Sequence, residues 1–269
     1  MSESSVRSTA SDLLVSEIIS GLDTVGVRDA DVVYLYSDFR GFGIRSGGAI
    51  DREALCDGIA RPMLERGQTL VIATFTYTSE GDFDVLSTPT NLGVMNKWIL
   101  KQPEVHRSEH PLFSYASLGP RASLVKQIGK SAFGYDSVFH RLLGKRAAFV
   151  HVGRPIWMGN TSLHFVEQLG GATYRVNKAF RTRVFEGARL VGSDYSAFVR
   201  RLDVPGESFA FSFKRGAEAL RRRGLIREVG SEADLTNISL MHYDDTIDLL
   251  HKLFSDDPSF FIASSFIQY

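Results

Sequence analysis

The sequence predicts an α/β protein: a three-layer α/β/α sandwich around a mainly parallel or mixed sheet. Three short stretches are almost continuously apolar, as buried central strands are: residues 31–37, 68–76 and 147–153. Stretches with apolar residues at helical spacing alternate with these strands, as residues 50–66 do between the first two. Strands that alternate with helices are typical of layered α/β domains.

The first elements follow from their local signals. Residues 12–22 have apolar positions at helical spacing and end at Gly21 and a turn-like Asp-Thr pair. The strand at 31–37 then leads through a glycine-rich turn, residues 38–48, into the helix at 50–66. A glycine-rich turn between a strand and a helix presents backbone N–H groups, which suit a phosphate.

The later elements are predicted by the same criteria. Residues 113–118 form a short strand, and residues 182–191 alternate like a strand, with Arg181 and Arg183 out of phase with Val184. The remaining helices are expected at residues 120–129, 136–143, 160–170, 193–202, 207–223 and 244–254.

Composition and charge exclude several classes of protein. The 269 residues include 31 acidic and 31 basic side chains, which gives no electrostatic reason to expect a nucleic-acid partner. A single cysteine, Cys56, allows no disulfide framework within the chain and no cysteine-based metal site. No apolar run is long enough to span a bilayer, and the N-terminus has no apolar signal region. We therefore expect a cytoplasmic protein with a flexible arm at residues 1–10 and a single domain at 11–269.

The segment from residue 159 to residue 170 holds the main candidate for chemistry. Asn160 or Thr161 is a good helix N-cap, and apolar residues then recur at helical spacing. His164 and Glu167 lie three residues apart and share one helix face. A carboxylate orients an imidazole and a helix N-terminus disfavours its charged form, so His164 has the setting of a neutral general base. On the spacing alone, an incidental pair on a surface helix is the more common explanation.

Two other chemistries find no support. The chain has no G-x-S-x-G turn of the kind that holds a hydrolase nucleophile. His106 and His110 have the spacing of two metal ligands on a helix, but Pro111 disfavours a helix there. We therefore expect no metal.

Four motifs in the same order carry a family resemblance. They are Arg107-Ser-Glu-His-Pro-Leu-Phe-Ser114, Phe133-Gly-Tyr-Asp-Ser137, Thr161-Ser-Leu-His-Phe-Val-Glu167 and Tyr174-Arg-Val-Asn-Lys178. At these separations they resemble the aminoglycoside 3-N-acetyltransferase family, and a weaker similarity runs from about Ser37 to the C-terminal helix. The resemblance implies the fold predicted above and acyl transfer from acetyl-CoA, or another acyl-CoA, to a primary amine of an aminoglycoside or amino sugar.

The same resemblance implies roles for particular residues. Attack of an amine on a thioester requires a base and donors for the oxyanion. His164 is expected to be the base, Glu167 to orient it and Thr161 to donate a hydrogen bond. His110 is expected to line the same cleft and contact the substrate. No covalent enzyme intermediate is needed, because a thioester is already activated.

Coenzyme A is expected at the glycine-rich turn. The resemblance assigns its pantetheine and pyrophosphate to Ser37, Gly43, Gly47 and Gly48, with Ser108 as a further contact. Gly43 and Gly47 do not have the spacing of a dinucleotide-binding fingerprint, so the turn alone is a weak signal.

The acceptor is the part that the sequence leaves most open. A long polar segment, residues 77–96, contains Glu80 and Asp82, which would attract an ammonium group, although a solvated acidic loop explains them equally well. The chain departs from the resistance enzymes at Tyr36, Asp38 and Ala73, where histidine, serine and proline are usual. A biosynthetic enzyme for a nucleotide-linked amino sugar is therefore an alternative.

A second alternative is a non-catalytic CoA-binding protein on the same fold. The presence of both His164 and Glu167 argues against it, because binding alone needs neither. The expected partners are thus acyl-CoA and a small amine, with a homodimer as an option and neither nucleic acid nor membrane.

Overall fold

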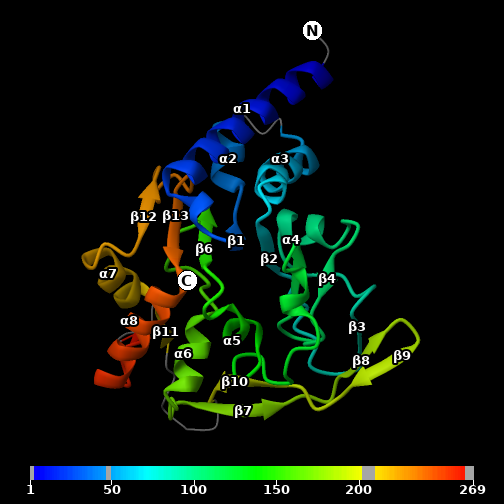
Figure 1. Ribbon diagram of the computed structural model, residues 1–269, viewed down its shortest axis with the longest axis vertical. Helices are drawn as coiled ribbons and strands as arrows, with labels where there is room; N and C mark the ends of the chain where they lie inside the picture. Colours follow the sequence, from blue (N-terminus) through cyan, green and yellow to red (C-terminus); the bar gives the residue numbers. More distant parts are fainter. Residues whose placement is uncertain (1–2, 47–49, 202–209, 264–269) are drawn as a thin grey trace.

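The computed structural model describes residues 3–46, 50–201 and 210–263, and a seven-stranded mixed sheet lies at its centre (Figure 1). The strand order is β12-β13-β6-β1-β2-β5-β4. The three central strands are those expected from their apolar sequence, and they are parallel: β1 (Val32–Ser37), β2 (Thr69–Ala73) and β6 (Ala147–Val152). All outer pairs are antiparallel: β4 (His106–Arg107), β5 (Tyr115–Leu118), β12 (Arg227–Val229) and β13 (Ile238–His242).

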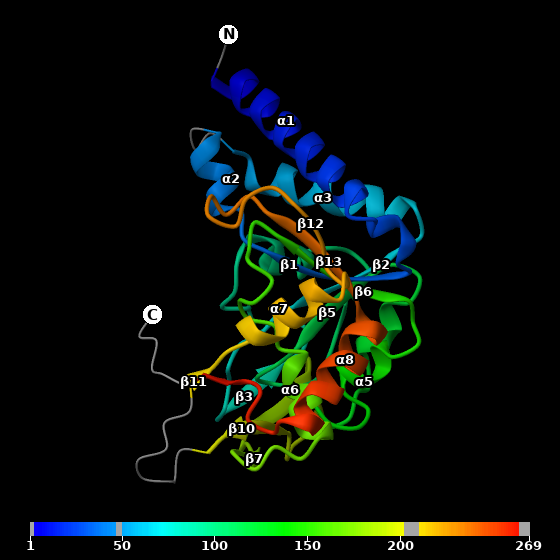
Figure 2. The same ribbon diagram turned by 90° about the vertical axis from the view of Figure 1, so that its left-hand side faces the viewer.

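Helices cover both faces of this sheet, so the three-layer architecture is confirmed (Figures 1 and 2). One layer consists of α1 (Glu3–Thr24), α2 (Arg40–Arg45), α3 (Arg52–Glu65) and α4 (Val94–Ile99). The other consists of α5 (Val138–Leu142), α6 (Leu163–Leu169), α7 (Lys214–Arg222) and α8 (Tyr243–Asp256). Alternate residues of β1 enter separate cores, Val33 and Leu35 on the α3 side and Tyr34 and Tyr36 on the α6 side.

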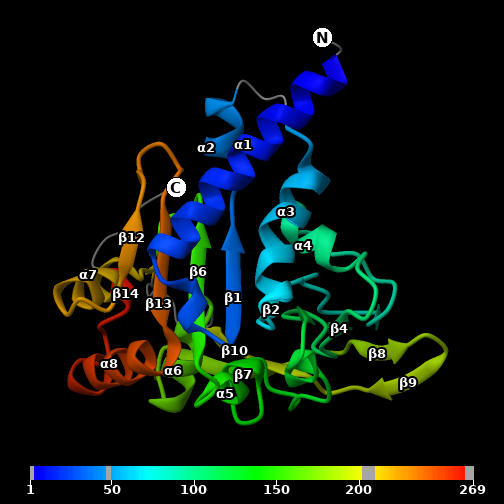
Figure 3. The ribbon, with the colours of Figure 1, turned by 45° about the horizontal axis from the view of Figure 1, so that its top comes forward.

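Three small sheets flank the main one. β7 (Arg175–Ala179) pairs with β10 (Ser196–Arg200), and β11 (Ala210–Phe211) pairs with β14 (Ile262–Ala263). β8 (Arg183–Glu186) pairs with β3 (Asp82–Asp84) and with β9 (Arg189–Gly192). Figures 1 and 3 show β8 and β9 extending away from the main sheet. Two short 3₁₀ helices, Val27–Asp29 and Ala122–Val125, complete the described elements.

Several predicted elements were wrong in extent. Residues 3–10, expected as a flexible arm, belong to α1, because neither glycine nor proline interrupts the helix before Gly21. The turn at 38–48 contains a short helix, α2. The helix at 120–129 is only a 3₁₀ turn, and Gln127 has a positive φ of 50°, which no continuing helix allows.

Other predictions failed in the second half of the chain. The single strand at 182–191 is a hairpin of β8 and β9, which turns at Gly187 with φ 61°. The helix at 193–202 is instead strand β10, because pairing with β7 outweighs local propensity. The helix at 207–223 begins only at Lys214, and residues 202–209 lie outside the described residues.

Gly153 fixes how the ends of β1 and β6 meet. Its φ is 66°, and a Cβ there would lie 2.0 Å from the backbone oxygen of Asp38. Only glycine allows both the backbone conformation and this approach. The segments that follow β1 and β6 therefore leave the sheet side by side, at the carboxyl edge where α/β proteins bind ligands.

We expect Gly153→Ala to lower the free energy of unfolding much more than Gly144→Ala. Gly144 has nearly the same φ, 67°, but no atom lies within 4 Å of its added Cβ. The control therefore costs only backbone strain, about 1–3 kcal/mol, while Gly153→Ala adds a backbone clash. Urea unfolding of both variants measures the difference, and equal losses would show that the close approach is not required.

Candidate functional site

Two adjoining pockets open at the carboxyl edge of the sheet. The larger has a volume of about 780 Å³ and lies between the segment after β1, helix α3 and the start of α4. The smaller has a volume of about 290 Å³ and is lined by the loop before α6, His164 and the segment before α7. Arg154, directly after β6, lines both pockets, so the two form neighbouring parts of one site.

His164 and Glu167 meet as their spacing predicts. His164 Nδ1 lies 2.6 Å from Glu167 Oε2, and the Glu167 side chain is completely buried. The same carboxylate accepts a hydrogen bond from the Tyr174 hydroxyl at 2.8 Å and forms an ion pair with Arg175 at 2.7 Å. The His164 ring packs edge-on against Phe133 and lines the smaller pocket. The carboxylate is thus held by partners on both oxygens, and it holds the imidazole in turn.

The electrostatics of this cluster favour an ionised Glu167 beside a neutral His164. Burial opposes ionisation of Glu167, but hydrogen bonds from His164 and Tyr174 and the charge of Arg175 outweigh it, and the pKa is lowered. The pKa of His164 is also lowered, mainly by burial and further by Arg175, although Glu167 acts in the opposite direction. An ionised carboxylate is only an acceptor, so Nδ1 carries the proton of the neutral ring.

The start of α6 differs from the expected capping. Ser162 is the N-cap residue and makes no side-chain capping bond. Asn160 Oδ1 instead accepts hydrogen bonds from the backbone N–H and the hydroxyl of Ser162. Thr161 Oγ1 lies 3.4 Å from the Tyr36 hydroxyl, and the Tyr36 ring stacks on His151. Thr161 therefore rests on the end of β1, one turn before His164.

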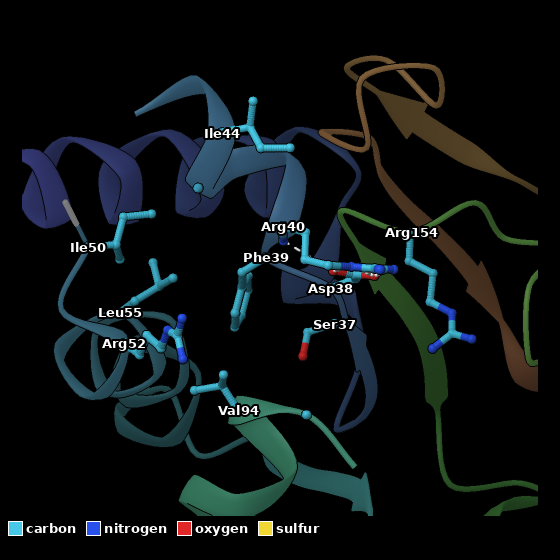
Figure 4. Close-up of a pocket in the computed structure, with 12 residues that line it drawn as sticks. Ser37, Asp38, Phe39, Arg40, Ile44, Ile50, Arg52, Leu55, Val94 and Arg154 are labelled. Atoms are coloured by element: carbon cyan, nitrogen blue, oxygen red, sulfur yellow. Dashed lines mark hydrogen bonds and ion pairs between the residues drawn. The ribbon is translucent and has the colours of Figure 1, made fainter. Parts of the chain in front are cut away.

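Ser37 and Gly43, predicted to bind coenzyme A, both line the larger pocket, and Figure 4 shows Ser37 there. Gly47 and Gly48 lie outside the described residues. The N-terminus of α3, expected to receive a phosphate, is occupied by the Asp51 carboxylate, which accepts from the backbone N–H groups of residues 53 and 54. Figure 4 shows Arg52 and Arg154 on opposite sides of the same pocket, so side-chain cations and not the helix end supply its positive charge.

Ser108 and His110 are buried away from both pockets. Ser108 Oγ accepts a hydrogen bond from the backbone N–H of Tyr115 and thereby joins β4 to β5. His110 Nε2 bonds to the Ser196 carbonyl, and its Nδ1 accepts from the N–H groups of residues 112 and 113. Burial lowers the pKa of His110 to about 4. These contacts anchor two loops, and neither residue is among those that line the pockets.

Glu80 and Asp82, predicted to attract the acceptor, are not brought to His164. Glu80 is exposed, and Asp82 in β3 pairs with Arg183 of the neighbouring strand at 2.8 Å. In Figure 1, β3 and β8 lie well away from α6. The residues of segment 77–96 that line a pocket, Gly93 and Val94, are uncharged.

Sequence reasoning missed four residues of the site. Arg175 and Tyr174 stood within a recognised motif but were given no role, although both contact Glu167. Arg154 and Trp157 follow β6, and a cation directly after a central strand was the available signal.

Within the described ranges, no group of three or more histidine, cysteine or carboxylate side chains could hold a metal ion. None of the described helices is long and apolar enough to cross a membrane.

A carboxylate-held histidine beside a ligand-sized pocket, at the carboxyl edge of an α/β sheet, is a site suited to taking a proton from a bound substrate. Residues 37–255 match the family described as Aminoglycoside 3-N-acetyltransferase, and the chain belongs to this family.

Individual relatives are distant. Aminoglycoside N(3)-acetyltransferase III of Serratia marcescens is 23% identical over 176 residues, which are 58% of this chain and 64% of that protein, just under two thirds of its length. Among solved structures, the aminoglycoside acetyltransferase AAC(3)-IVa apoenzyme has a TM-score of 0.71 and 23% identity, over 92% of this chain and 90% of that one. A mutant of that enzyme in complex with gentamicin has a TM-score of 0.72 and 22% identity, over 91% and 90%.

YokD from Bacillus subtilis has the same architecture at lower identity. Its TM-score is 0.71 and its identity 16%, over 91% of this chain and 94% of that one. At such identities the similarity shows the fold, which agrees with the mixed α/β sheet described above.

Proposed function

We propose that the protein is a CoA-dependent N-acyltransferase, which transfers an acetyl or other acyl group to a primary amine of an aminoglycoside or amino sugar. The single observation that carries the proposal is the His164–Glu167–Arg175 cluster at the smaller pocket, which joins the larger pocket at Arg154. Family membership supports the same reaction class.

The side chains present match the needs of this reaction. With Nδ1 bonded to Glu167, Nε2 of His164 is the nitrogen that takes the proton from the attacking amine. The amine nitrogen forms the new C–N bond, the C–S bond of the thioester breaks, and the proton passes on to the leaving thiolate. Thr161 lines the same pocket and donates to the oxygen on which negative charge develops.

The larger pocket suits the nucleotide end of acyl-CoA. Its volume of about 780 Å³ lies within the range of ligand pockets. Arg52 offers a guanidinium group to a phosphate, and Ser37 offers a hydroxyl at the end of β1 (Figure 4). Acyl-CoA supplies the activated acyl group. Its thioester would reach His164 past Arg154, where the pockets meet.

Arg52→Gln should raise KM for acetyl-CoA about 10-fold or more and leave kcat nearly unchanged, because a charged hydrogen bond lost equally from ground and transition states weakens binding alone. Steady-state assays of thiol release measure both constants. Arg61→Gln is the matched control, since Arg61 lies on the same helix but pairs with Asp57 outside this pocket. An unchanged KM in a folded Arg52 variant would place coenzyme A elsewhere.

The proposed function is tested by incubating the protein with acetyl-CoA and a panel of amines, with free thiol and acylated amine measured together. Thiol release that depends on the amine supports it. Tight binding of acetyl-CoA without transfer to any amine would support the CoA-binding alternative.

A further inference from the structure

The smaller pocket has the wrong charge for a polycation. Its described lining consists of Arg154, Trp157, Met158, Gly159, Asn160, Thr161, His164, Ser212 and Phe213, and none of these is acidic. The carboxylate that holds His164, that of Glu167, is completely buried and paired with Arg175. Asp38, in the larger pocket, is paired with Arg40. Two carboxylates near the site are therefore already neutralised by arginines.

Positive charge, by contrast, lies directly at this pocket. Arg154 lines both pockets, donates from Nε to the Met158 carbonyl at 3.0 Å and packs against Gly159, but it has no ion pair with a carboxylate of the described residues. Lys214 Nζ lies 4.6 Å from the centre of the ring of Trp157, which is one of the residues that line this pocket. A polycation would enter against both charges, whereas an anionic group would be attracted to Arg154.

The size of the pocket and the side chains that line it restrict the class of ligand further. The volume of about 290 Å³ is at the small end of ligand pockets and suits a single ring. Trp157 and Phe213 offer apolar faces to such a ring.

Given the proposed acyl transfer, on which this inference rests, we propose that the acceptor is a one-ring amine carrying a phosphate or carboxylate group that Arg154 binds, and that a polycationic aminoglycoside is a poor substrate. His164 then receives the amine and Arg154 holds the anion, since both residues line this pocket. Arg154 thus determines which amines are accepted.

The test compares glucosamine 6-phosphate, glucosamine and gentamicin as acceptors at saturating acetyl-CoA. The first two differ only in an anionic group, so their ratio of kcat/KM isolates its recognition. We expect glucosamine 6-phosphate to exceed glucosamine by about 10- to 100-fold, the range of a charge-assisted hydrogen bond, and gentamicin to be slower than glucosamine. The ratio should fall close to one in Arg154→Gln and remain largely intact in Arg154→Lys, which keeps the charge.

Two controls separate this inference from others. Arg215→Gln removes an exposed cation of the same helix as Lys214 that lines neither pocket, and it should leave the ratio unchanged. KM for acetyl-CoA should change little in Arg154→Gln. If KM for acetyl-CoA rose in this variant while the ratio of kcat/KM for glucosamine 6-phosphate and glucosamine stayed the same, Arg154 would bind coenzyme A and the inference would be overturned. Faster turnover of gentamicin than of the two glucosamines would also overturn the inference, while it would support acyl transfer. If none of the amines were acylated, the proposed acyl transfer itself would be wrong.

Discussion

Replacing His164 with alanine should lower kcat for acyl transfer by ~10²–10⁴-fold, the usual contribution of a general base. The affinity for acetyl-CoA should change little, because His164 lines the smaller pocket and is not among the residues of the larger one. Thiol release gives the rate, and calorimetry with coenzyme A gives the affinity.

His140→Ala is the control for this experiment. His140 lies on α5, and its ring contacts Tyr135 and Phe165 rather than the Glu167 carboxylate. We expect this variant to retain both activity and affinity. If the His164 variant lost affinity for coenzyme A as severely as turnover, the ring would have a structural role and not a catalytic one.

Replacing Glu167 with glutamine should also reduce turnover, though less than loss of the imidazole, because glutamine keeps the size of the side chain and loses only its charge. It should in addition shift the pH dependence of kcat/KM. The hydrogen bond and charge of Glu167 raise the pKa of His164, so their loss lowers that pKa. In the proposed mechanism, activity requires the neutral ring and is lost as pH falls through the pKa of His164. The acid limb should therefore move to lower pH in Glu167→Gln.

Arg175→Gln gives the opposite shift and serves as the paired test. The positive charge of Arg175 lowers the pKa of His164, so its removal should move the acid limb to higher pH. In the wild type the limb should lie below about 6.5, the ordinary pKa of histidine. If the acid limb of kcat/KM lay at the same pH in the wild type and in both variants, a group other than His164 would control the pH dependence.

Patterns within single segments predicted the centre of the fold. β1, β2 and β6 are buried on both faces, so each reads as an unbroken apolar run. The strands of the two-stranded sheet β7–β10 lacked such a signal. β7 is largely exposed and β10 carries both buried and exposed residues, and they form a sheet only because each pairs with the other.

The same distinction, between patterns within one segment and contacts between distant segments, holds for the site. The contact between His164 and Glu167 is local to one helix, and a spacing of three residues was enough to predict it. The pairing of Arg175 with Glu167 depends on the turn after α6, and the capping of α3 by Asp51 depends on how the chain enters that helix. The placement of Glu80 and Asp82 depends on the pairing of β3 with β8, more than one hundred residues later, which no local pattern reveals.

The central claim is direct transfer from acyl-CoA to an amine with His164 as the base. Its most direct test is to measure, in one reaction of the unmodified protein with acetyl-CoA and glucosamine 6-phosphate, the thiol released, the N-acetylated amine formed and the mass of the protein. We predict one molecule of acetylated amine for each thiol and an unchanged protein mass at every time point. Thiol release without acetylated amine, or accumulation of an acetylated protein before any product, would contradict it.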